Sequence, residues 1–109
     1  MDPKPGKNWK LELRYGRLRT PFSHFTAIAS GRAGDLAEGF TCRPGPAVMA
    51  IKLWAESADH AIALTRSIAV RHGFDASGRI QIYQTEPDEP PREHPHGYGI
   101  SFHAYDEED

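Results

Sequence analysis

The chain has 109 residues, of which 39% are hydrophobic and 26% are charged, and these values fit one globular domain. Its net charge of −2 gives no bulk attraction to nucleic acid or to a membrane surface, and no apolar run approaches the ~20 residues that cross a bilayer. The single cysteine, Cys42, excludes an intrachain disulfide and favours a soluble protein of the reducing cytoplasm.

The charges are distributed unevenly along the chain. Residues 1–54 carry nine Lys/Arg and four Asp/Glu, whereas residues 55–109 carry four Lys/Arg and eleven Asp/Glu. Such asymmetry marks either a polarised surface or two halves that neutralise each other in the fold.

The first part of the chain reads as an arm followed by a strand. Residues 1–8, with two prolines and a glycine, predict a loose N-terminal arm. From Trp9 to Leu18 apolar and charged residues alternate with a period of two, which predicts a half-buried strand of an antiparallel sheet. His24–Ser30 predicts a second strand, and the Gly- and Pro-rich residues 31–46 predict a long loop.

A strand–helix–strand unit follows between Ala47 and Thr85. Val48–Trp54 predicts the third strand. Ser57 suits a helix N-cap, and the following apolar residues recur at helical spacing up to Gly73, where a left-handed residue ends a helix well. Arg79–Thr85 predicts the fourth strand.

The last part of the chain contains a Pro-rich segment and one more strand. The prolines of residues 86–97 exclude a helix or a central strand and predict an extended strap. Tyr98–Tyr105 alternates again and predicts the fifth strand, and residues 106–109 form an acidic tail.

These elements predict a single α+β domain over residues 1–109. The sheet is mainly antiparallel, with about five strands in the chain order β-β-β-α-β-β, and one main helix packs on one of its faces. The other face then stays open, which favours self-association as a homodimer.

The histidines are the strongest chemical signal. His94 and His96 point to the same side of an extended segment, and His103 lies on the next strand, so the three could hold zinc with one open position. Against this hypothesis, the chain has none of the usual zinc-ligand spacings. Exposed loop histidines beside prolines are the alternative interpretation, and we expect no other cofactor.

A second candidate pair is His24 with Cys42, which flank the 31–46 loop. In contact, they would form a nucleophile and its base, or line a small-ligand pocket between this loop and the strap. A lone cysteine also fits a small buried apolar residue.

Basic residues surround aromatic ones near the N-terminus, where Trp9 and Tyr15 are interleaved with Lys10, Arg14, Arg17 and Arg19. A basic aromatic sheet face can stack RNA bases. Here the alternation separates the aromatic face from the basic face, so an acidic partner protein is preferred over nucleic acid.

No catalytic or nucleotide-binding motif accompanies these features, since neither GRAG at 31–34 nor GYG at 97–99 matches a phosphate-binding loop. The sequence therefore favours a small protein-interaction or regulatory module without catalytic activity. The alternatives are an enzyme or small-ligand binder that uses the histidine-bearing pocket, and a histidine-based metal-binding protein.

Overall fold

The computed structural model describes residues 7–36, 39–40 and 42–104. The proposed acidic tail and most of the proposed arm lie outside these residues. Along the chain, the described elements are α1 (Trp9–Arg14), β1 (Ser23–Ala33), β2 (Gly45–Ala55), α2 (Ala58–Arg71), β3 (Phe74–Asp75), β4 (Ile80–Gln84) and β5 (His96–Ala104).

The strands form one antiparallel sheet in the order β3-β1-β2-β5, with β4 also paired to β1. β1 and β2 make a long hairpin from the pair Ser23–Ala55 to the pair Ala33–Gly45. β4 and β3 share the outer side of β1, and β5 pairs with β2 on the other side. The prediction of an α+β domain with a five-stranded antiparallel sheet is therefore confirmed.

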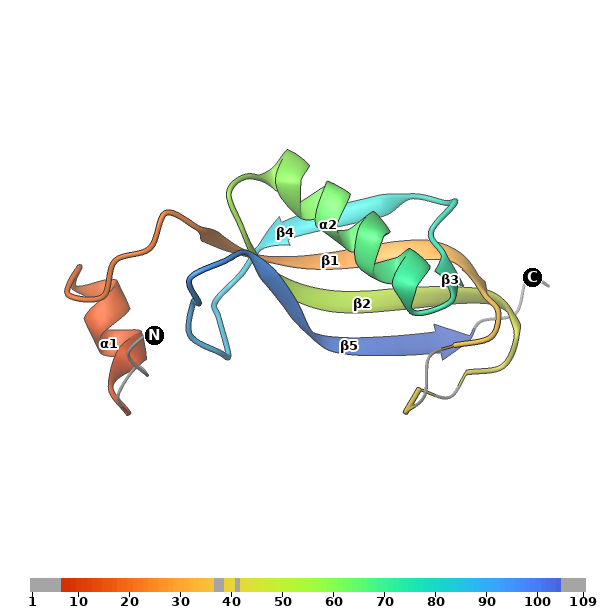
Figure 1. Cartoon of the computed structure of the whole chain (residues 1–109), viewed down its shortest axis with the longest axis horizontal. Coiled ribbons are helices and arrows are strands. Elements are labelled where there is room, and N and C mark those ends of the chain that lie inside the picture. Colours follow the sequence, from red (N-terminus) through yellow and green to blue (C-terminus); the bar gives the residue numbers. More distant parts are fainter. Residues whose placement is uncertain (1–6, 37–38, 41, 105–109) are drawn as a thin grey trace.

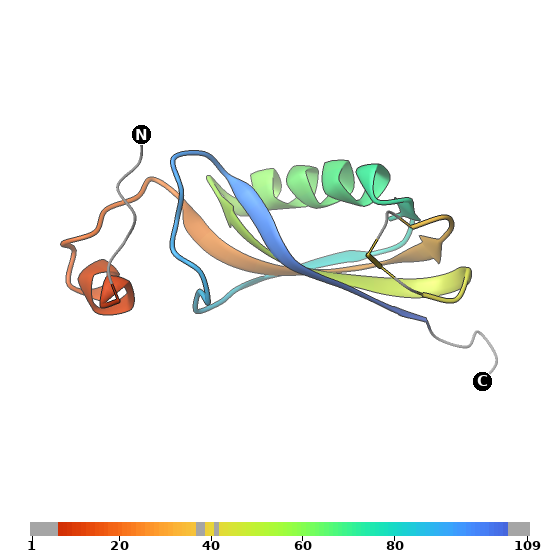
Figure 2. The same ribbon diagram turned by 60° about the horizontal axis from the view of Figure 1, so that its bottom comes forward.

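The main helix, α2, lies across one face of the sheet (Figures 1 and 2). The Ser57 side chain caps its first turn by accepting a hydrogen bond from the backbone N–H of His60 at 3.1 Å. Gly73 follows its last turn with φ of +81°, which confirms the predicted left-handed end. The core lies between this helix and the sheet and includes Met49, Ile51, Leu53, Ala61, Ala69 and Phe74.

No helix among the described residues covers the other face of the sheet. The strand register places on it alternate residues of each strand, and we call this surface the open face. It comprises His24, Thr26, Ile28 and Ser30 of β1, Val48, Ala50, Lys52 and Trp54 of β2, Gln81 and Tyr83 of β4, and His96, Tyr98, Ser101 and His103 of β5.

The prediction of a strand over Trp9–Leu18 is wrong, because this segment forms α1 and a turn. Lys, Leu, Glu and Arg are strong helix formers, and the same spacing sets Trp9 above Leu13 and Leu11 above Tyr15 on a helix surface. Both edges of β1 are already occupied, so no place remains beside it for a further strand. The fifth strand is instead the two-residue β3, which pairs with Arg32 and Ala33.

Two boundaries also differ from the sequence-based expectation. The predicted 31–46 loop is shorter, because β1 continues to Ala33 and β2 already begins at Gly45. β5 begins at His96, inside the predicted strap. From here on, the strap means residues 86–95. No helix among the described residues combines the length and the apolar character needed to cross a membrane.

Candidate functional site

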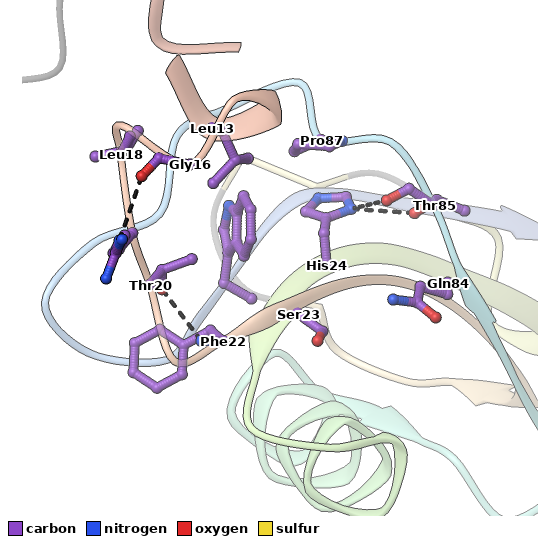
Figure 3. A pocket seen from close by; sticks show the side chains of 12 residues that line it. Leu13, Gly16, Leu18, Thr20, Phe22, Ser23, His24, Gln84, Thr85 and Pro87 are labelled. Carbon is purple, nitrogen blue, oxygen red and sulfur yellow. Dashed lines mark hydrogen bonds between the residues drawn. The ribbon is translucent and has the colours of Figure 1, made fainter. Parts of the chain in front are cut away.

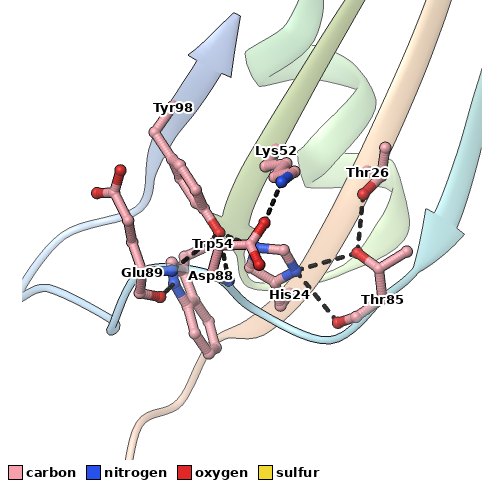
Figure 4. Close-up of polar contacts among 8 residues, drawn as sticks. All are labelled: His24, Thr26, Lys52, Trp54, Thr85, Asp88, Glu89 and Tyr98. Atoms are coloured by element: carbon pink, nitrogen blue, oxygen red, sulfur yellow. Dashed lines mark hydrogen bonds and ion pairs between the residues drawn. The ribbon is translucent and has the colours of Figure 1, made fainter. Parts of the chain in front are cut away.

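His24 is the most buried polar side chain at the end of the sheet where the strap crosses the open face. Its side chain reaches three groups, the carbonyl oxygen of Thr85 at 3.1 Å, the Thr85 hydroxyl at 3.1 Å and the Tyr98 hydroxyl at 2.6 Å (Figure 4). Only 4% of the residue is exposed. The His24 ring therefore joins three elements: the start of β1, the start of β5 and the residue that follows β4.

These partners fix the form of the His24 ring. A carbonyl oxygen only accepts hydrogen bonds, so Nδ1, which faces the Thr85 carbonyl, carries the proton. In the neutral ring Nε2 is then an acceptor, and the Tyr98 hydroxyl donates to it. Burial lowers the pKa of His24 below its ordinary 6.5, against smaller opposing effects of the Thr85 backbone and Asp88. The site thus favours the neutral ring, with a hydrogen bond at each of its two nitrogens.

The Tyr98 hydroxyl also holds the strap. Its oxygen accepts hydrogen bonds from the backbone N–H groups of Asp88 at 3.0 Å and Glu89 at 3.3 Å. Beside it, the indole Nε1–H of Trp54 donates to the Glu89 carbonyl at 2.9 Å. Two side chains of the sheet therefore fix the strap through its backbone, which depends little on the identity of the strap residues.

An ion pair between Lys52 and Asp88 lies at the rim of this network (Figure 4). The Lys52 hydrogen bond lowers the pKa of Asp88, and the same bond raises the pKa of Lys52. Both side chains are substantially exposed, at 39% and 56%, so water screens the pair and its contribution to stability is small.

His96 lies next to Tyr98, with ring centroids 5.8 Å apart. Both of its ring nitrogens are buried, and neither has a hydrogen-bonding partner among the described residues. Burial has the largest effect on the pKa of His96 and lowers it, and the nearby Arg92 lowers it further. The His94 backbone offsets part of this effect, although it makes no hydrogen bond of normal geometry to the ring. A charged His96 is therefore disfavoured under the closed strap.

An open hollow of about 510 Å³ separates this network from the α1 segment, by which we mean residues 7–22 (Figure 3). Its lining includes Leu13, Leu18, Arg19, Phe22, His24, Trp54, Gln84, Thr85 and Pro87.

The α1 segment extends beyond the end of the sheet (Figure 1). None of the six described residues of α1 is buried. Leu11 is 50% exposed and Tyr15 is 72% exposed, although both are apolar enough to favour burial. Lys10 and Arg14 line a smaller hollow together with Glu86 and Pro87 of the strap. The four basic residues predicted as a partner site thus lie in one segment at one end of the molecule, on a helix and a turn rather than on a sheet face.

The structure does not bring the proposed zinc ligands together. His96 and His103 lie at opposite ends of β5, about 20 Å apart in an extended chain, and His94 is on the strap. Among the described residues, no group of three His, Cys, Asp or Glu side chains is arranged to hold a metal ion.

His24 and Cys42 are also far apart. His24 lies near the start of β1, whereas Cys42 precedes β2 at the opposite end of the hairpin. The Cys42 thiol contacts the Arg43 carbonyl at 3.6 Å, and its side chain packs against the core. The interpretation of Cys42 as a partly buried apolar residue fits this position.

Sequence reasoning missed Thr85, Trp54, Asp88 and Tyr98 as members of the network around His24. Alternation places Trp54 and Tyr98 on defined faces of their strands, but the faces meet only through the register of β2 with β5. No signal in the sequence gives that register.

Comparison of the chain with protein-family models, with curated proteins and with solved structures found no match.

Proposed function

We propose that this protein is a non-catalytic interaction module that binds an acidic segment of a partner protein through its α1 segment. The observation that carries this proposal is the state of α1, which exposes cations and two large apolar side chains together. A helix of six residues is too short to be stable by itself in water, so contact with a partner would stabilise it.

The charges and apolar groups of the α1 segment fit the chemistry of protein recognition. Arg and Tyr are enriched among the residues that dominate binding energies, and cations at the rim steer an acidic partner into place. Lys10, Arg14, Arg17 and Arg19 are all exposed, and Leu11 and Tyr15 supply the apolar contact.

An enzyme or small-ligand site that uses the histidines has weaker support. A general base needs a nitrogen that is free to take a proton from its substrate. Both ring nitrogens of His24 are already hydrogen-bonded within the protein, those of His96 are buried away from a substrate, and Cys42 is at the far end of the hairpin. The network around His24 therefore fits the positioning of the strap better than catalysis.

Charge reversal tests the interaction proposal. Tagged protein should capture one stoichiometric partner from a lysate of its own organism, and the double variant Lys10→Glu/Arg14→Glu should lose it. The matched control is Arg71→Glu/Arg79→Glu, which reverses two exposed cations elsewhere and should keep the partner. Retention by the first variant contradicts the proposal, and loss of the partner after nuclease treatment assigns the site to nucleic acid.

We also propose that the open face pairs with the open face of a second copy. On this face Ile28, Val48, Ala50 and Tyr83 are neutral and partly exposed, and Tyr83 is 48% exposed. The charge of Lys52 on the same face is paired with that of Asp88. Two copies of such a face can meet across a two-fold axis without like-charge repulsion. An acidic or basic partner surface, in contrast, would find no complementary charge there.

Light scattering after gel filtration tests this pairing. We expect a particle of twice the chain mass of 12.2 kDa. Ala50→Arg places an unpaired charge in the contact and should give the single-chain mass, whereas Ala63→Arg on the exposed side of α2 should leave the dimer intact. A single-chain mass for the unmodified protein, or a dimer that tolerates Ala50→Arg, contradicts the proposed face.

The free thiol of Cys42 suits a reducing compartment, so we propose that the protein works in the cytoplasm.

A further inference from the structure

We propose that the strap is an acid-sensitive clamp, in which protonation of His24 releases residues 86–95 from the open face of the sheet. The strap and His24 lie across the hollow from the α1 segment, so this proposal does not depend on the proposed partner. It depends on the hydrogen bonds that meet at one atom, the Tyr98 hydroxyl oxygen.

In the closed state this oxygen is fully used. Its proton goes to Nε2 of His24, and its two lone pairs accept from the backbone N–H groups of Asp88 and Glu89. Because Nδ1 of His24 donates to the Thr85 carbonyl, every group around the ring has a partner of the right kind.

Protonation of His24 breaks this match. Nε2 becomes a donor, so three N–H groups compete for the two lone pairs of the Tyr98 oxygen, and the Tyr98 proton loses its acceptor. At least one strap N–H must leave or share its acceptor. Withdrawal of the strap removes the conflict, because water then hydrates both the imidazolium and the freed amides.

The charged and titratable groups around His24 come from every element packed on it. Lys52 of β2 and His96 of β5 disfavour its protonation, and Asp88 of the strap favours it. Arg19 lines the same hollow, and Glu89 and Arg92 lie by His96. Burial has the largest effect and lowers the pKa of His24, so the net environment of the closed state opposes the charged ring.

The sign of the pH dependence follows from this direction. The open state binds the proton more readily than the closed state, so closure is favoured above the ordinary pKa of 6.5 and weakens as the pH falls below it. The Lys52–Asp88 pair does not respond in that range, because the pKa of Asp88 lies below its ordinary 3.8. The effect of His24 on the strap can therefore be distinguished from that of the ion pair by its pH range.

Hydrogen exchange at two amides measures the clamp directly. The backbone amides of Asp88 and Glu89, corrected for their intrinsic exchange rates, should lose protection severalfold between about pH 7.5 and about pH 5. The amides of β1 and β2 should keep theirs and so exclude global unfolding. Unchanged protection at residues 88 and 89 would overturn the proposal.

Substitutions assign the effect to His24 and Tyr98. His24→Gln can still donate and accept but does not titrate, and it is combined with His96→Gln because the closed strap also disfavours a charged His96. Exchange at residues 88 and 89 in this double variant should not depend on pH, whereas His96→Gln alone should keep the pH dependence. Tyr98→Phe removes the shared acceptor and should leave both amides unprotected at each pH. A pH-dependent loss of protection that persists in the double variant or in Tyr98→Phe overturns the clamp. If the double variant fails to fold, the titration of the His24 ring in the unmodified protein, followed by NMR, decides, and a midpoint that differs from that of the amide exchange overturns the clamp.

Discussion

Replacement of Gly73 by alanine should lower the free energy of unfolding by about 3 kcal/mol or more, because two costs coincide at this position. Gly73 has φ of +81°, a region that side-chain-bearing residues rarely adopt. A Cβ atom there would also lie 2.1 Å from the carbonyl oxygen of Asp35, which belongs to the backbone and cannot turn away. Denaturant unfolding followed by circular dichroism measures the loss.

Gly99 provides the matched control for Gly73. It too has a positive φ, of +63°, but a Cβ there would meet only the flexible Lys52 side chain at 3.7 Å. Gly99→Ala should therefore cost about 1–2 kcal/mol, which is the conformational cost alone. Equal losses in the two variants would mean that the contact of the α2 end with Asp35 does not constrain the fold.

Truncation of Phe74 to alanine should cost about 4 kcal/mol of unfolding free energy, as expected for a large aromatic side chain removed from a core. Phe74 is 1% exposed and packs against Phe102 at a ring-centroid distance of 5.6 Å. It follows α2 directly, so the cavity would separate the end of the helix from β5. The same denaturant experiment gives the value.

Val70→Ala is the control for Phe74. Val70 lies in the last turn of α2, four residues before Phe74, but it is 75% exposed, and its truncation should change the stability by no more than about 0.5 kcal/mol. A loss below about 1 kcal/mol in Phe74→Ala would contradict the described core.

Local patterns predicted most of the fold. Ser57 and Gly73 mark the two ends of α2 through hydrogen bonding and backbone conformation within a few residues. The alternation in His24–Ser30 and Val48–Trp54 reports one buried face, so β1 and β2 were predictable. The α1 segment was not, because a short alternating run also suits a helix and only the occupied edges of β1 decide between them.

The site around His24 could not be predicted, because its members come from distant parts of the chain. His24 and Tyr98 are 74 positions apart, and Trp54 and Glu89 are 35 apart. Their contact depends on the register of three strand pairs and on the path of the strap. The four cations of the α1 segment were named from the sequence because they lie within one short stretch, although the sequence suggested a sheet face.

The strap lies beside both the His24 network and the α1 segment. Pro87 lines both the large hollow beside His24 and the smaller one beside Lys10 and Arg14. Release of the clamp would therefore also remove one wall beside the α1 segment. The proposed function requires that a partner covers that segment.

Site-specific photo-crosslinking in cells of the native organism tests this most directly. A photoreactive phenylalanine analogue replaces Tyr15, which is 72% exposed on the α1 segment, and in a parallel strain it replaces Val70, which is 75% exposed on α2. We expect one crosslinked protein of defined mass at position 15 and none at position 70. No crosslink at position 15, or the same products at both positions, would contradict the proposal that the α1 segment is a partner-binding surface.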